Sequence, residues 1–126
     1  HGDLHHGNFL FAEGRVAGYF DLEDLCQGYP TDDLVRYFVC ASEHLRWYEQ
    51  HRKRRILALF AQVVRRTPYS SHEWEIALNA LLMRKIVAKA ERGRLGWWQT
   101  ANLLFRTAYY RKLKRIVRSC TRGNAA

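Results

Sequence analysis

The sequence predicts an α+β fold that is mainly helical, with a loop-rich segment at the start and a helical body behind it. Two short apolar runs, 9–11 and 16–20, flank a Gly-containing turn, a pattern typical of a β-hairpin. After residue 30, apolar side chains recur at the spacing of amphipathic helices. The length suits one domain, and we expect it to cover 1–126, with an active segment over 1–30 and a helical subdomain over 31–122.

The predicted helices cover about 33–49, 56–64, 70–92 and 97–118. A Gly-Tyr-Pro break at 28–30 precedes the first helix, and Thr31 or Asp32 can cap its start. Pro68 ends the second helix, because helical geometry is disfavoured for the residue before a proline. The Ser-x-x-Glu pattern at 70–73 is a capping box that opens the third helix.

The composition excludes several classes of protein. No apolar run reaches the length of about 18 residues that a membrane-spanning helix needs, and the first residues do not resemble a secretion signal. The three cysteines, Cys26, Cys40 and Cys120, form no C-x-x-C pair, so neither a disulfide framework nor a zinc site is indicated. A reducing, cytoplasmic setting is the simplest interpretation.

Charge is divided unevenly along the chain. Residues 1–50 contain nine acidic and three basic residues, a net charge of −6, while residues 51–126 contain eighteen basic and three acidic residues, a net charge of +15. The acidic part has the composition of a metal-ion site. The basic part suits a nucleic acid, an anionic membrane or a phosphorylated substrate as partner.

The first eight residues, His-Gly-Asp-Leu-His-His-Gly-Asn, carry the strongest chemical signal. Asp3 is followed five positions later by Asn8 on a loop that enters a strand, which is the spacing of a kinase catalytic loop. Phosphoryl transfer requires a positioned nucleophile and cations that neutralise the phosphate oxygens. A compact loop of this length can place a carboxylate at the acceptor hydroxyl and an amide oxygen at a metal ion.

Asp21 is the second expected metal ligand. It lies thirteen residues after Asn8, at the end of the predicted hairpin, and a hairpin that leaves the loop returns the chain to the same place. Mg²⁺ prefers a few hard oxygen ligands, so Asn8 and Asp21 would suffice together with phosphate oxygens and water.

Three pieces of sequence in this order resemble the aminoglycoside phosphotransferase and choline kinase superfamily. They are the first eight residues, Asp21-Leu22-Glu23-Asp24, and the Gly-x-Pro-x-x-Asp-Leu pattern at 28–34. The resemblance covers about residues 1–40 and implies the C-terminal lobe of a protein-kinase-like fold. It implies an ATP- and Mg²⁺-dependent phosphotransferase acting on a hydroxyl group of a small molecule or sugar.

The resemblance also implies roles for individual residues. Asp3 would be the catalytic base, and Asn8 and Asp21 would hold Mg²⁺. Asp33 would anchor the helix that braces the loop, with His1 and Glu23 in supporting positions.

Two positions and one missing feature depart from related patterns. Gly2 replaces the Arg usual in protein kinases, which favours the small-molecule branch, and His6 replaces a common Pro. No Gly-rich phosphate loop or strand Lys is present, and in this superfamily both precede the catalytic loop. We therefore expect a chain without the N-terminal nucleotide-binding lobe, inactive by itself, with its nucleotide-binding residues unknown.

Two other classes of function compete with this interpretation. His1, Asp3, His5, His6 and Asp21 could form the transition-metal cluster of a hydrolase. That class needs further distant ligands, and the later histidines fall in predicted helices. The other class is a non-catalytic kinase-like module that binds an anionic partner.

The last part of the chain is basic and aromatic. From Arg92 onward it carries nine basic residues, no acidic residue and interleaved Trp, Phe and Tyr. This pattern suits either a solvated helix face or peripheral contact with an anionic membrane or lipopolysaccharide. Nucleic acid is disfavoured because no recognition motif accompanies the charge. The sequence therefore leaves two classes of acceptor. One is a cationic molecule that resembles an aminoglycoside or choline, and the other is an anionic sugar of the lipopolysaccharide core that would be phosphorylated at the inner membrane face.

Overall fold

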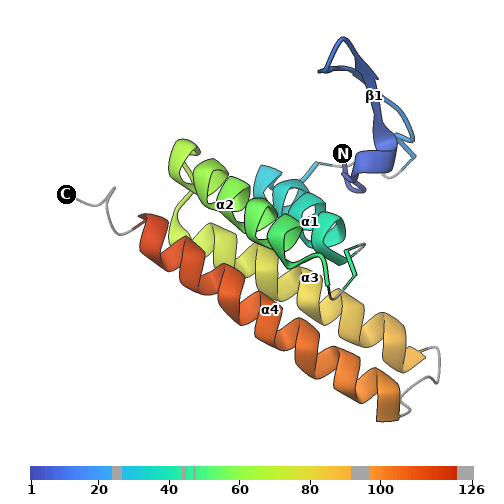
Figure 1. Ribbon diagram of the computed structural model, residues 1–126, viewed down its shortest axis with the longest axis vertical. Coiled ribbons are helices and arrows are strands. Elements are labelled where there is room, and N and C mark those ends of the chain that lie inside the picture. The colour runs from blue at the N-terminus through green and yellow to red at the C-terminus, as the bar shows by residue number, and fades with distance from the viewer. Residues whose placement is uncertain (24–26, 44, 47, 92–96, 122–126) are drawn as a thin grey trace. The chain divides into compact units, whose positions relative to one another are not determined.

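A computed structural model describes residues 1–23, 27–43, 45–46, 48–91 and 97–121, apart from the side chains of 6, 89 and 97–106. The elements are a 3-10 turn η1 (His6–Asn8), strands β1 (Phe9–Ala12) and β2 (Arg15–Tyr19), and helices α1 (Pro30–Glu43), α2 (Gln50–Arg66), α3 (Ser71–Glu91) and α4 (Trp97–Thr121). Figure 1 shows this order from the N-terminal hairpin to the C-terminal helix. The mainly helical α+β prediction is confirmed. Asp24, Cys26, Arg92, Arg94 and Arg122 lie outside the described residues.

The chain forms two compact units, His1–Phe60 and Ala61–Ala126. The boundary between them falls within α2. None of the described helices is both long and apolar enough to cross a membrane.

The hairpin is built from a tight turn and a short antiparallel ladder. Glu13 and Gly14 both have positive φ, 52° and 73°, which is the backbone of a two-residue turn that matches strand twist. Phe9 pairs with Tyr19 and Leu10 with Gly18, and the register then shifts so that Phe11 pairs with Val16. The predicted hairpin is therefore present, with one irregularity in β2.

Helix α1 begins earlier and ends earlier than its apolar pattern indicates. Pro30 occupies the first helical position, where its missing N–H costs nothing and its fixed φ suits a helix. The helix ends at Glu43. Further along the chain, Glu49 N donates to Arg46 O, and Arg46 N donates to the Glu49 carboxylate. That backbone hydrogen bond from Arg46 is the main cause that lowers the pKa of Glu49.

The core of the first unit lies along one face of α1. Val35 and Val39 are fully buried, and the Phe38 ring packs edge-on against Phe60, with ring centroids 5.2 Å apart. Such i, i+4 spacing of buried side chains gives the helix one face toward the core and leaves the other for polar contacts. Thr31 and Ser42 are the polar residues buried in this helix.

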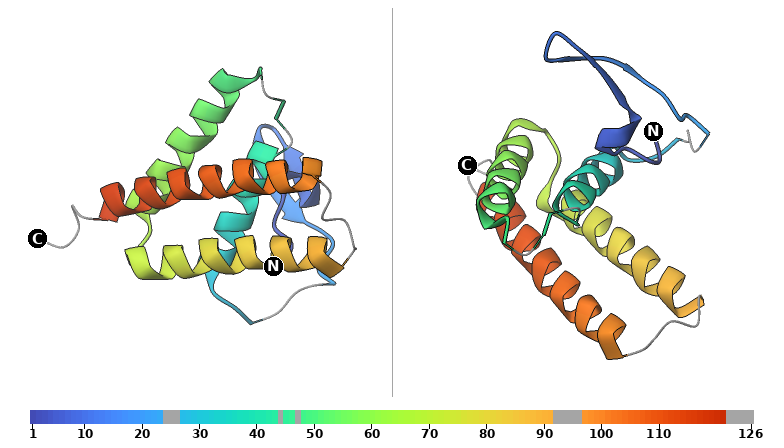
Figure 2. Two further views of the ribbon diagram at one scale, coloured as in Figure 1. Left: turned by 90° about the horizontal axis from the view of Figure 1, so that it is seen from below. Right: turned by 45° about the vertical axis from the view of Figure 1, so that its right-hand side comes forward.

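The second unit is built around α3 and α4, which run side by side in both Figure 1 and Figure 2. The predicted capping box is present: Ser70 N donates to Glu73 Oε2 over 2.7 Å, and Glu73 N donates to Ser70 Oγ over 3.3 Å. Trp74, Leu78 and Leu113, which belong to this unit, are fully buried.

A bidentate ion pair joins α3 to α4 at the surface. Arg118 donates from Nε and NH2 to the two carboxylate oxygens of Glu75, over 2.7 and 3.0 Å. The hydrogen bond from Arg118 holds the pKa of the Glu75 carboxyl below its ordinary value of 4.5. Because the folded pKa is depressed, this pair contributes stability above the unfolded pKa and loses it as pH falls through the folded pKa.

Glu75→Gln should therefore lower the urea midpoint at pH 7, and the difference from wild type should vanish as the pH drops well below 4.5. The midpoint is measured by circular dichroism at each pH. Glu91→Gln, on the same helix but with no ion pair among the described residues, serves as the control. A midpoint difference that persists at the lowest pH would show that the pair is not the cause.

Candidate active site

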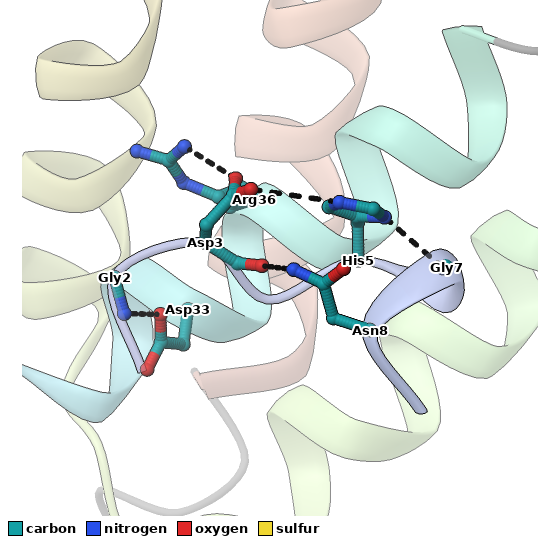
Figure 3. A network of polar contacts seen from close by, with 7 residues as sticks. All are labelled: Gly2, Asp3, His5, Gly7, Asn8, Asp33 and Arg36. Carbon is teal, nitrogen blue, oxygen red and sulfur yellow. Dashed lines mark hydrogen bonds and ion pairs between the residues drawn. The ribbon is translucent and has the colours of Figure 1, made fainter. Parts of the chain in front are cut away.

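The loop that carries the proposed chemistry is held at its start by Asp33, in the first turn of α1. The backbone nitrogens of His1 and Gly2 donate to the two oxygens of this carboxylate, over 2.7 and 2.9 Å. Gly2 has a φ of 82°, in the left-handed region that glycine adopts without strain. The backbone thus explains the glycine at this position, and Asp33 connects the start of the loop to α1 (Figure 3).

Asp3 is contacted by two side chains. Arg36 NH1 lies 3.0 Å from Oδ1, and His5 Nε2 lies 3.5 Å from Oδ2. Figure 3 shows Asp3 between these two groups. The Asp3 side chain keeps about a third of its surface exposed, 32%, so a molecule from solvent can reach it.

His5 is held in one orientation by the loop itself. Its Nδ1 accepts the Gly7 N–H over 3.0 Å, so the proton of the neutral ring belongs on Nε2, which faces Asp3. A Cβ at Gly7 would lie 2.8 Å from the His5 ring carbon Cε1, which is too close for any side chain without displacement of the ring. The glycine therefore permits the close approach of loop backbone to imidazole.

Asn8 is buried, with 4% of its surface exposed, and its amide is oriented by Asp3. Asn8 Nδ2 donates to the backbone oxygen of Asp3 over 3.1 Å. A carbonyl can only accept, so this contact assigns which end of the amide carries nitrogen. Oδ1 has no hydrogen-bond partner among the described residues, and its chemistry suits Mg²⁺.

The hairpin returns the chain to Asn8. Phe20 N donates to Asn8 O over 3.2 Å, and this contact extends the pairing of β1 with β2 by one step. Asp21 follows directly, with a φ of 59°, an unusual value that Asp tolerates better than most residues. This backbone hydrogen bond therefore holds Phe20, the residue before Asp21, next to Asn8.

The structure does not bring every expected side chain together. Asp21 and Glu23 are exposed and make no hydrogen bond or ion pair with another described residue. Among the described residues, no three His, Cys, Asp or Glu side chains gather closely enough to hold a metal ion. The Asn8 amide oxygen and the Asp21 carboxylate make no hydrogen bond or ion pair with another described residue.

The His1 ring packs against the hairpin. It lies edge-on to Tyr19, with ring centroids 6.3 Å apart, and its side chain is 8% exposed. Both ring nitrogens are buried without a hydrogen-bond partner among the described residues. His1 contacts Asp33 through its backbone nitrogen and not through its ring.

Arg36 is the residue that the sequence-based argument missed. It lies three positions after Asp33, so both side chains project from the same face of α1. The sequence signal that could have indicated Arg36 was a basic residue one helical turn after Asp33. By itself, an arginine at i+3 is equally typical of a solvated helix face, and only the fold shows its contact with Asp3.

The loop, the hairpin that returns to it and the helix whose Asp33 and Arg36 hold it all lie within the first 43 residues. The chain matches the phosphotransferase enzyme family over residues 1–74, more than half its length, and it belongs to that family. No curated protein and no solved structure gives a significant match. The family agrees with the predicted relationship to aminoglycoside phosphotransferases and choline kinases.

Proposed function

We propose that this chain is the C-terminal catalytic lobe of a kinase that uses ATP and Mg²⁺ to phosphorylate a hydroxyl group on a small molecule or sugar. The observation that carries the proposal is the oriented pair of Asp3 and Asn8. The Asp3 carboxylate is accessible and held by charged and polar neighbours, while the Asn8 amide directs its nitrogen to Asp3 O. Positioning and electrostatics of this kind supply most of the catalysis in phosphoryl transfer.

In this mechanism Asp3 orients the acceptor hydroxyl and accepts its proton. Asn8 Oδ1 and the Asp21 carboxylate would hold Mg²⁺, which when bound neutralises charge on the phosphate oxygens. Asp33 keeps the loop in place through the nitrogens of His1 and Gly2. Glu23, exposed two residues beyond Asp21, would support the metal site from the surface.

We propose an anionic sugar, such as one of the lipopolysaccharide core, as the acceptor, phosphorylated on the cytoplasmic side of the inner membrane. The basic surface of α4 supports this proposal. Arg111, Lys112 and Arg115 are exposed there, whereas Arg118 is paired with Glu75. Exposed bases on a helix favour peripheral contact with an anionic membrane surface. A cationic, aminoglycoside- or choline-like acceptor is the alternative, which the acidic residues of the first unit favour.

The test compares Asp21→Asn with Glu13→Gln in the full-length protein. Both acids are exposed on the hairpin and both have positive φ, but only Asp21 belongs to the proposed metal site. Asn tolerates positive φ, so the first change removes charge and keeps the backbone. Each protein is incubated with γ-labelled ATP and Mg²⁺ in an extract of source cells, and label is counted in glycolipid and small-molecule fractions.

We expect wild type and Glu13→Gln to transfer label, and Asp21→Asn to require more Mg²⁺ for the same transfer. Label in glycolipid supports the envelope sugar, and label in the small-molecule fraction supports the alternative acceptor. Equal transfer by Asp21→Asn at every Mg²⁺ concentration refutes the assigned ligand. Absence of transfer by wild type favours the non-catalytic module.

A further inference from the structure

The two oxygens of the Asp3 carboxylate are held unequally. Oδ1 receives a charge-assisted hydrogen bond from Arg36 over 3.0 Å, within the usual range for such bonds. Oδ2 lies 3.5 Å from His5 Nε2, beyond the distance of a good hydrogen bond. One oxygen is therefore fixed and the other is weakly engaged.

We propose that Arg36 is a positioning residue for phosphoryl transfer, which fixes Oδ1 so that Oδ2 is presented to the acceptor hydroxyl. His5 lies on the Oδ2 side. When the acceptor binds, the weak contact between Oδ2 and His5 Nε2–H is replaced by a hydrogen bond from the acceptor hydroxyl to Oδ2. This inference rests on the proposed role of Asp3 and adds a residue to it. It also selects which carboxylate oxygen accepts the proton.

Because Arg36 lies in the same helix as Asp33, the two residues together restrict the movement of the Asp3 side chain. Asp33 holds the backbone of His1 and Gly2, and Arg36, one turn later, holds the side chain of Asp3. Three consecutive loop residues are thus tied to two side chains on one face of one helix. Neither the backbone before Asp3 nor the carboxylate itself can rotate without breaking one of these contacts.

The guanidinium group suits this task better than an ammonium group. Its planar geometry fixes the direction of each N–H, and it stays charged at every physiological pH. The Arg36 side chain is 26% exposed, so water only partly screens its contact with Asp3. Among the described residues Asp3 is its single hydrogen-bond partner, so its orientation serves this carboxylate.

The experiment uses the full-length protein with Arg36→Met, Arg36→Lys and a matched control, Arg52→Met. Arg52 also pairs with a carboxylate, that of Glu49 over 2.8 Å, and lies in the same unit but outside the site. Two properties are measured: kcat and KM for Mg-ATP in the labelling assay, and the ring ¹⁵N shifts of His5 at one fixed pH without nucleotide.

We expect Arg36→Met to lower kcat roughly 10- to 100-fold with little change in KM for Mg-ATP, because the carboxylate is misplaced while nucleotide binding is intact. Arg36→Lys should recover part of the loss. The His5 shifts should change in Arg36→Met, since the released carboxylate turns toward Nε2, and should stay at wild-type values in Arg52→Met.

Unchanged His5 shifts in Arg36→Met would overturn the inference, whether or not the protein transfers phosphate. A merely structural brace would lower the thermal midpoint and give no recovery of kcat in Arg36→Lys, and this outcome also overturns it. If Asp3→Asn leaves transfer unaffected, the proposed function fails instead, and the His5 shifts still report whether Arg36 holds the carboxylate.

Discussion

Replacing Asp3 with Asn should lower kcat for phosphoryl transfer by about 10²- to 10⁴-fold, the range that a positioned acid–base group contributes. Asn keeps the volume of the side chain but removes the charge that Arg36 contacts and the oxygen that accepts the hydroxyl proton. The KM for Mg-ATP should change little, because the proposed role of this carboxylate is toward the acceptor hydroxyl and not toward the nucleotide.

The measurement is the initial rate of label transfer from γ-labelled ATP to the acceptor fraction, at saturating Mg²⁺. Asp32→Asn is the matched control, since Asp32 is also an acid of the first unit and its side chain makes no ion pair among the described residues. If the two variants retain equal activity, Asp3 is not the group that positions the acceptor.

Replacing Trp74 with Ala should destabilise the second unit by about 3–5 kcal/mol, the usual cost of removing a large buried aromatic side chain. Trp74 is fully buried at the start of α3, and Tyr69 packs edge-on against its ring with centroids 6.2 Å apart. Small domains are stable by only about 5–15 kcal/mol, so this single change removes a large part of the total.

The loss is measured as a shift in the urea unfolding curve followed by circular dichroism. Ile76→Ala provides the comparison, because Ile76 lies two residues later on the same helix and is 50% exposed. We expect its cost to be several times smaller. Similar costs for the two substitutions would mean that the core of this unit is not centred on Trp74.

Local features of the fold were predictable from the sequence because their causes lie within a few residues. The turn at Glu13 and Gly14 needs two residues of positive φ, and the capping box needs only Ser70 and Glu73. The position of Asp33 against the loop was also within reach, through the resemblance to known phosphotransferases.

Features that depend on tertiary contacts were not predictable. The end of α1 at Glu43 was also not predicted, because no Gly or Pro marks it. The contact of Arg36 with Asp3 spans 33 positions in the sequence, so no local spacing indicates it. The orientation of His5 toward Asp3 joins residues only two positions apart, but it depends on the Gly7 N–H fixing the imidazole ring, which no residue pattern indicates.

The acids that follow the hairpin illustrate a second limit. Spacing placed Asp21 near Asn8, and the hydrogen bond from Phe20 N to Asn8 O shows how the backbone achieves this. Spacing could not indicate that both Asp21 and Glu23 point to solvent without a polar partner among the described residues. A side chain whose proposed partner is a metal ion needs no protein partner, so its sequence neighbours carry little information about its orientation.

The attachment of the loop to α1 also has a consequence for order in solution. Fixing the backbone of one residue costs about 1–2 kcal/mol of conformational entropy, so an eight-residue loop with little regular structure is costly to immobilise. Asp33 and Arg36 supply long-range contacts to residues 1–3 that offset part of this cost, and both come from the first two turns of one helix. When those turns unfold locally, residues 1–3 lose these contacts together. We therefore expect the start of the loop and the start of α1 to open as one cooperative unit, so that the stability of the first turns of α1 limits the time for which Asp3 stays in position.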